Sequence, residues 1–236
     1  MPSYPPAFPR AVVLVCLASL GLAIAWDLTG LDLPVMRLIG NHQGFPLRSD
    51  PWLSEAMHDR FRQLAMALLA VLVVWAVLPE AQGRLPRGER IAVVGSVLVS
   101  LLVVNLLKLG SLSSCPWELT EFGGRAWHVS HWRWGVADGG GGRCFPGGHA
   151  SSALAFVGLA LPGLGRGRRA GWVWLSLTVL LGVAAGGAQT LRGAHYPSHT
   201  LWTLVVCLAC SAAVWSLALR HRTRPAHQPS PMRSGR

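Results

Sequence analysis

Six long apolar stretches dominate the chain and restrict it to folds that a lipid bilayer can surround. Each is close to the roughly 20 residues that an α-helix needs to cross the hydrocarbon core. Only 13% of the residues are charged, which is about half the share in an average soluble domain. The sequence therefore predicts an all-α fold, an integral membrane six-helix bundle. The predicted helices cover approximately residues 11–26, 64–80, 91–107, 149–165, 171–187 and 199–219.

The two ends of the chain differ in character. The first apolar stretch follows Arg10 and has the length of a signal peptide, but no small-residue cleavage site comes after it. We therefore expect a retained first helix and a single membrane domain over residues 1–219. Residues 220–236 are rich in Pro, Ser and Arg, so they are predicted to form a disordered basic tail. Nothing in the sequence indicates the oligomeric state.

Basic residues are distributed unevenly between the predicted connections. With the N-terminus in the cytoplasm, twelve of the 21 Lys and Arg residues fall on the inner side, and the outer segments are close to neutral. The positive-inside rule then places both termini in the cytoplasm of a bacterial inner membrane. Three loops, about 27–63, 108–148 and 188–198, would face the periplasm. The net charge of +11 is explained as an orientation signal, so no nucleic-acid partner is expected.

Ionisable residues gather at the predicted outer ends of the helices. Lys108 closes the third apolar stretch, and His149 opens the fourth, directly after Pro146, Gly147 and Gly148. A helix N-terminus exposes unpaired backbone N–H groups, and glycine lets an anion approach them. This segment predicts an oxyanion cradle in which the amides of Gly147 and Gly148 face a phosphate and His149 donates a proton from the first helical turn. Taken singly, Lys108 and His149 are also typical of interfacial anchors.

A third group lies before the sixth apolar stretch. His195 and His199 are four residues apart, and Arg192 is just upstream. On a helix this spacing would place both imidazoles on one face, as in a metal-binding pair. Pro197 lies between them, however, and is more typical of a helix start than of a helix interior. A metalloenzyme that uses His149, His195 and His199 is therefore kept as an alternative, and no metal or cofactor is expected.

In order and spacing, these residues resemble the motifs of the type 2 phosphatidic acid phosphatases, which share a catalytic core with vanadium haloperoxidases. That family has a lysine six residues before Arg-Pro, then Pro-Ser-Gly-His, then Ser-Arg, five residues, His, three residues and Asp. The resemblance covers about residues 64–219 and, in the wording CPW, FPGGH and RGAH, is similar to a variant subgroup. The matching positions are Lys108 with Cys115-Pro116, Pro146-Gly147-Gly148-His149, and Ala188-Gln189 with His195 and His199.

The resemblance implies a membrane phosphatase that hydrolyses a lipid phosphate or pyrophosphate at the periplasmic face without a metal. His195 would attack phosphorus to give a phosphohistidine, and His149 would protonate the leaving oxygen. Lys108 and the glycine amides would bind the phosphate. His199 would replace the family's aspartate as the residue that orients the nucleophile.

Other motif positions also depart from the family pattern. Cys115 and Gln189 stand where the family has its two arginines, and a glycine replaces its serine. Arg192, one helical turn from Gln189, or Arg143 could supply the missing guanidinium. The competing interpretations are a lipid phosphotransferase that uses the same residues and a protein that binds or transports lipid phosphates without turnover.

Two further patterns predict how the segments are held together. Cys115 and Cys144 both lie in the long outer loop, where an oxidising periplasm permits a disulfide. We predict a bond between them that links the two phosphate-facing segments. Gly182 and Gly186 form a GxxxG pattern in the fifth apolar stretch, which is typical of close helix packing.

Overall fold

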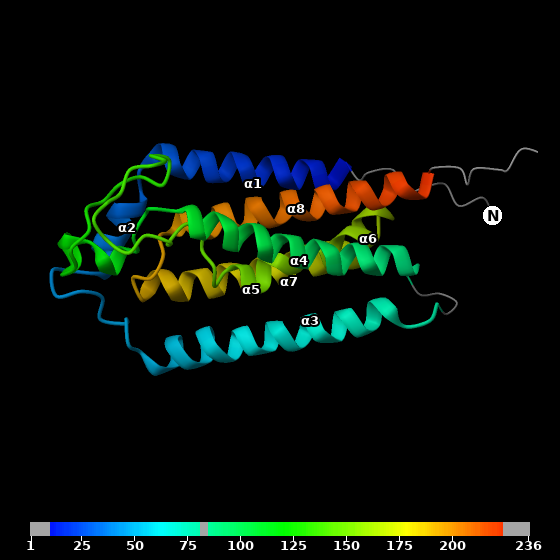
Figure 1. Cartoon of the computed structure of the whole chain (residues 1–236), viewed down its shortest axis with the longest axis horizontal. Helices are drawn as coiled ribbons and strands as arrows, with labels where there is room; N and C mark the ends of the chain where they lie inside the picture. Colours follow the sequence, from blue (N-terminus) through cyan, green and yellow to red (C-terminus); the bar gives the residue numbers. More distant parts are fainter. Residues whose placement is uncertain (1–9, 81–84, 224–236) are drawn as a thin grey trace, which may run out of the picture.

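The computed structural model describes residues 10–80 and 85–223 and arranges them as a bundle of helices (Figure 1). These residues form no β-strand, so the predicted all-α fold is confirmed. The α-helices are α1 Arg10–Thr29, α2 Asp32–Ile39, α3 Phe61–Val77, α4 Arg87–Gly110, α5 Ser151–Leu154, α6 Leu161–Gly165, α7 Arg169–Leu191 and α8 Pro197–Thr223. The other helical segments are the π-helical η1 Trp52–Arg60 and the 3₁₀ segments η2 Pro116–Glu118, η3 Thr120–Phe122 and η4 Ala155–Ala160.

Helix length separates the predicted membrane spans into two groups. Two of the six correspond to shorter apolar segments, Phe61–Val77 and Ser151–Gly165. The 17 residues of α3 would extend about 25 Å, less than the roughly 30 Å of a hydrocarbon core. The chain is thus a membrane protein with four helices long and apolar enough to span a bilayer. They are Arg10–Thr29, Arg87–Gly110, Arg169–Leu191 and Pro197–Arg220.

The fourth predicted helix is broken into α5, η4 and α6. Pro162 has no backbone N–H to donate to the carbonyl of Gly158, and the N–H of Leu161 bonds that carbonyl in the 3₁₀ pattern instead. The helical segment also begins at Ser151, later than predicted. His149 therefore lies in a turn before the helix and not in its first turn.

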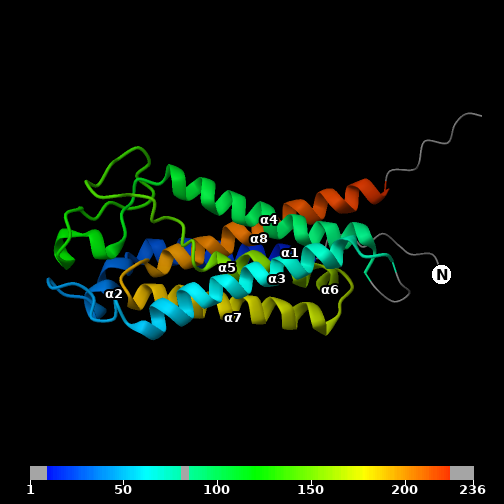
Figure 2. The same ribbon diagram turned by 60° about the horizontal axis from the view of Figure 1, so that its bottom comes forward.

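The connections that carry the candidate site residues gather at one end of the bundle, on the left in Figures 1 and 2. They are the segment around α2, the long loop between α4 and α5, and the α7–α8 connection. The beginning of α1 and the end of α8 lie at the opposite end. Of the predicted tail 220–236, the first residues continue α8 to Thr223, and residues 224–236 lie outside the described residues.

The bundle is apolar both inside and outside. Val97 and Val104 of α4 pack in a core with Trp215 of α8, and all three are almost completely buried. On the outer faces, Leu64 of α3 and Leu180 of α7 are each 68% exposed. Large apolar side chains facing outward over several helices are what a lipid environment requires and what water disfavours.

Two of the basic residues that the predicted orientation assigns to the inner side also hold helices together. Arg90 is fully buried and donates hydrogen bonds to the carbonyls of Trp75 at 2.5 Å and Leu78 at 2.8 Å. Arg166 donates to the carboxylate of Glu89 at 2.7 Å. These contacts tie α3 and α6 to the start of α4, so part of the positive charge at this end has a structural role.

The glycine pair of α7 packs closely against neighbouring helices, as predicted. A Cβ on Gly182 would lie 2.3 Å from Cδ2 of Leu154, and one on Gly186 would lie 2.1 Å from Oγ1 of Thr200. Because Gly186 has no side chain, α7 can approach the first turn of α8, which carries His199.

Candidate active site

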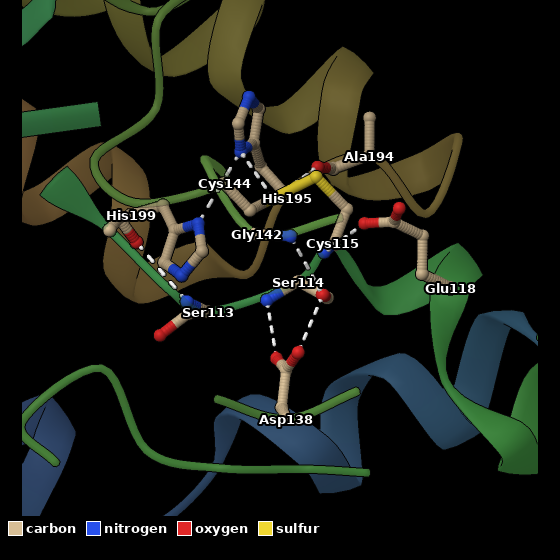
Figure 3. Close-up of a disulfide and its surroundings, with 11 residues drawn as sticks. Ser113, Ser114, Cys115, Glu118, Asp138, Gly142, Cys144, Ala194, His195 and His199 are labelled. Carbon is tan, nitrogen blue, oxygen red and sulfur yellow. Dashed lines mark hydrogen bonds between the residues drawn. A yellow bond between two sulfur atoms is a disulfide. The ribbon is translucent and has the colours of Figure 1, made fainter. Parts of the chain in front are cut away.

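Three segments that are far apart in the sequence meet at the loop-bearing end of the bundle. They are the last turn of α4 with Lys108, the turn that follows Cys144, and the α7–α8 connection with His195. The predicted disulfide between Cys115 and Cys144 is present, with the two Cα atoms 5.2 Å apart (Figure 3). The sulfur of Cys144 lies 3.1 Å from the carbonyl oxygen of Ala194. The disulfide thus packs directly against the residue that precedes His195.

Side chains on the other side of the disulfide hold the loop in place (Figure 3). The buried carboxylate of Asp138 accepts hydrogen bonds from the backbone N–H of Ser114 at 2.6 Å and from its hydroxyl at 2.8 Å. It also accepts the N–H of Gly140 at 3.0 Å. Glu118 accepts the N–H of Cys115 at 2.8 Å. These charge-assisted bonds fix the backbone on which the disulfide is mounted.

His195 and His199 form a buried pair. Their side chains come from the α7–α8 connection and the first turn of α8, and only 3% and 1% of the two residues is exposed. The two Nδ1 atoms are 3.3 Å apart, so one ring donates to the other. Cys144 Sγ lies 3.4 Å from the same Nδ1 of His195. Figure 3 shows the second ring nitrogen of His195, Nε2, directed away from both neighbours.

The surroundings of His195 favour the neutral imidazole. Burial holds the pKa of His195 well below its ordinary value, and His199, Lys108 and His149 lower it further. A hydrogen bond with the backbone of Cys144 opposes this shift and is the smaller effect. When Nδ1–H of the neutral ring is directed at His199, a lone pair remains on Nε2, which is the requirement for a nucleophile.

His149 and Lys108 lie near His195. The ring centroids of His149 and His195 are 5.8 Å apart. A Cβ on Gly148 would lie 3.1 Å from Nζ of Lys108, so the ammonium group rests against the Gly148 backbone. A cavity of about 400 Å³ opens here between α3, α4 and the turn before α5. Its polar lining residues are Arg62, Asn105, Lys108, His149, Ser151 and Ser152.

The Gly147 amide is used differently from the prediction. Its N–H donates to the carbonyl of His199 at 3.2 Å, and its own carbonyl accepts the hydroxyl of Thr203 at 3.0 Å. Gly147 therefore fastens the turn to α8 and does not direct its N–H into the cavity. The prediction was wrong for this amide because its N–H already donates a hydrogen bond to a distant segment of the chain.

The arginines proposed from the sequence do not line the cavity of Lys108 and His149. Arg192 donates to the carbonyl of Arg48 at 3.0 Å and to Oε1 of Gln189 at 3.3 Å. The backbone N–H of Arg143 donates to the backbone carbonyl of Ser111 at 2.8 Å. The guanidinium that does line the cavity belongs to a residue outside every motif, Arg62 in the first turn of α3.

Sequence reasoning missed Arg62, although a signal was present. Arg62 stands at the outer start of the second apolar stretch, and Lys108 stands at the outer end of the third. Consecutive helices joined by a short connection are antiparallel neighbours, so these two ends must come close together. A basic residue at each of the two ends is therefore a signal that favours a shared anion site.

Gln189 occupies the position of the family's second arginine and is almost completely buried, with 1% of its surface exposed. Its Oε1 accepts from Arg192. Its Nε2 has no hydrogen-bond partner among the described residues. A buried N–H donor without a partner is costly, so Gln189 offers a neutral donor where the family has a charged one.

The three histidines do not form a metal cluster. Among the described residues, two groups bring three potential metal-ligating atoms within 4.8 Å of one another. One consists of His195 with Cys115 and Cys144, whose sulfur atoms are already joined in the disulfide. The other, Asp27, Asp32 and His131, lies apart from the cavity of Lys108 and His149.

Comparison with known proteins gives one match. The sequence model of a family described as the PAP2 superfamily matches residues 90–223, more than half of the chain. The matched region includes Lys108, His149 and His195. No curated protein and no solved structure is significantly similar to the chain.

Proposed function

We propose, because this chain belongs to the PAP2 superfamily, that it is an integral membrane phosphatase that hydrolyses a phosphate monoester or pyrophosphate on a lipid. The reaction takes place at the periplasmic face of a bacterial inner membrane, through a phosphohistidine and without a metal. The observation that carries this proposal is the 5.8 Å separation of the His149 and His195 rings beside the cavity that Lys108 lines.

His195 is the proposed nucleophile. Its Nε2 forms a bond to phosphorus while the bond from phosphorus to the leaving oxygen breaks, and the ring becomes positively charged. His199, 3.3 Å away, accepts the Nδ1–H and orients the ring. A neutral imidazole stabilises that charge less than the family's aspartate would, because it carries no charge of its own.

His149 is the proposed general acid and then the general base. It donates a proton to the leaving oxygen, and the product lipid departs. A water molecule then attacks the phosphohistidine and gives its proton to His149, which breaks the bond to Nε2 of His195 and releases inorganic phosphate. Both rings return to their starting protonation states, so the cycle is balanced.

Positive and polar groups along the cavity wall would bind the phosphate oxygens. Lys108 and Arg62 supply the charge, and Asn105, Ser151 and Ser152 of the same wall supply neutral hydrogen-bond donors. Groups that are already in place when charge develops supply most of the rate enhancement in phosphoryl transfer.

An adjoining cavity supports a lipid substrate. It measures about 320 Å³, lies between α3 and α7, and is lined almost entirely by apolar side chains. It shares Ala65, Ser152 and Phe156 with the cavity of Lys108 and His149. A molecule with a phosphate head and an apolar chain could occupy both, whereas a small water-soluble phosphate would use only the polar part.

The proposed topology has six crossings, with both termini in the cytoplasm and one domain over residues 1–219 that contains the phosphatase core at about 64–219. The clustering of the candidate outer loops at one end of the bundle supports this arrangement (Figure 1). The chain would belong to a variant subgroup of the superfamily, an assignment that the motif wording CPW, FPGGH and RGAH supports.

The experiment that tests the function is a panel of substrates with purified protein in detergent. Phosphatidic acid, phosphatidylglycerol phosphate, undecaprenyl pyrophosphate and lipid A are incubated in the presence of a chelator, with glycerol phosphate as the water-soluble control. We expect release of inorganic phosphate from at least one lipid and little from glycerol phosphate.

Analysis of the lipid products separates the alternatives. Transfer of phosphate to a second lipid would indicate a phosphotransferase. Thermal stabilisation by a lipid phosphate without any phosphate release from the panel would contradict hydrolysis and indicate a binding or transport protein.

Two arginine variants test which guanidinium contacts the substrate. Arg62→Ala should lower kcat/KM for the preferred lipid by about tenfold or more, because a charge-assisted contact to phosphate is worth roughly 1.5–3 kcal/mol. Arg192→Ala, the matched control, should remain within about twofold of the wild type once folded protein is quantified. The opposite ranking would assign phosphate binding to Arg192 and remove Arg62 from the site.

A further inference from the structure

Two carboxylates and an imidazole to which the proposed reaction assigns no role meet beside a second cavity. Asp27 lies near the end of α1, Asp32 begins α2, and His131 belongs to the long loop between α4 and α5. One donor atom from each lies within 4.8 Å of the other two. All three line a cavity of about 180 Å³, whose wall also includes His199.

The carboxylates are held in place by neutral donors. Asp27 Oδ2 accepts the indole N–H groups of Trp132 and Trp202, both at 2.8 Å. Asp32 Oδ1 accepts the indole N–H of Trp26 at 2.8 Å and the backbone N–H of Ser198 at 3.0 Å, and its Oδ2 accepts the Ser198 hydroxyl. Donors of this kind orient metal-binding carboxylates.

No lysine or arginine of the described chain pairs with either carboxylate. Two carboxylates so close together in a partly enclosed cavity repel each other. The hydrogen bonds around them are all to neutral groups. A bound cation would remove this repulsion.

His131 directs a buried ring nitrogen toward Asp27. Its side chain is only 8% exposed, and Nε2 lies 3.4 Å from Oδ2 of Asp27. That nitrogen forms no hydrogen bond within the described part of the chain. The ring is stacked on Phe145, with centroids 4.2 Å apart and an interplanar angle of 10°, which restrains the plane of the ring while Nε2 faces Asp27.

We propose that Asp27, Asp32 and His131 bind a divalent transition-metal ion, Zn²⁺ or Mn²⁺, in this cavity. One nitrogen and two carboxylate oxygens suit these ions, whereas Ca²⁺ prefers oxygen ligands only and Cu⁺ prefers sulfur. The cavity leaves room for water at the remaining coordination positions. The ion joins the α4–α5 loop to the α1–α2 corner and so stabilises the wall of the fold next to His199.

Metal uptake by the full-length chain tests this site without any assay of activity. The purified protein is treated with chelator, incubated with Zn²⁺ or with Mn²⁺, desalted and analysed for bound metal per chain, and affinity is measured by titration. The wild type should retain one ion more than His131→Phe. The affinity of this variant should fall by at least about 100-fold, more than the loss of an outer hydrogen-bond partner costs.

His131→Phe keeps an aromatic ring to stack on Phe145, so it removes the ligand with little change in packing. Asp32→Asn is the second variant and should also lose the ion. His128→Phe is the matched control because His128 lines the same cavity but is not one of the three proposed ligands, and it should retain the ion. Equal metal content in the wild type and His131→Phe, or none in either, would reduce the cluster to an Asp27–His131 ion pair and overturn the proposal.

Discussion

Replacement of His195 by alanine is expected to lower phosphate release from the preferred lipid by at least about a thousandfold, because the proposed mechanism has no second nucleophile. The residue is 3% exposed and its Nε2 is directed away from the His199 and disulfide contacts (Figure 3). The measurement is kcat for phosphate release at saturating lipid, together with trapping of a phosphorylated intermediate in the wild type.

The controls separate catalysis from folding. His42→Ala changes an exposed loop histidine and should leave kcat unchanged. His195→Ala should unfold at a lower temperature than the wild type, because loss of a buried ring leaves a cavity, so kcat is compared per folded protein at a temperature at which both proteins are folded. Full activity in a well-folded His195→Ala protein would exclude the phosphohistidine mechanism.

The pH dependence follows from the environment of the same ring. His195 must be neutral to attack, and burial lowers its pKa below the ordinary value. The His195 ring therefore becomes protonated, and unable to attack phosphorus, only at a lower pH than an ordinary histidine. The acid side of the kcat/KM profile should therefore decline below about pH 6.5, the ordinary value for histidine, and not above it.

Much of the fold could be predicted because hydropathy is a local property. The apolar stretches, the Cys115–Cys144 pair and the close packing at Gly186 each depend on a few neighbouring residues or on one shared loop. The helix break at Pro162 was missed because the apolar composition of that stretch continues through it. A proline and glycines inside the stretch are the signal that would have indicated the break.

The site was predicted less completely because contacts between distant segments decide it. The motif spacing placed His149 and His195 in the candidate site, and the structure brings their rings close together. The motif spacing could not reveal that Gly147 donates to His199 or that Arg62 lines the cavity. The cluster around His131 joins residues a hundred positions apart, which no local pattern describes.

Replacement of His149 by alanine is expected to have the second large effect, and the size should depend on the leaving group. A lipid alkoxide needs a proton as it departs, whereas p-nitrophenolate leaves readily without one. We expect kcat/KM to fall by at least about 100-fold for the lipid phosphate, the usual contribution of general acid catalysis. For p-nitrophenyl phosphate we expect a loss of less than about tenfold.

The comparison uses kcat/KM because this constant includes only the steps up to cleavage of the bond to the leaving oxygen. The later attack of water on the phosphohistidine does not affect it. The two substrates share the phosphate group, so a defect in phosphate binding would lower both values equally. An equal loss for both would assign His149 to binding beside Lys108, whose ammonium lies against Gly148. A loss confined to the lipid would establish that the ring 5.8 Å from His195 supplies the proton.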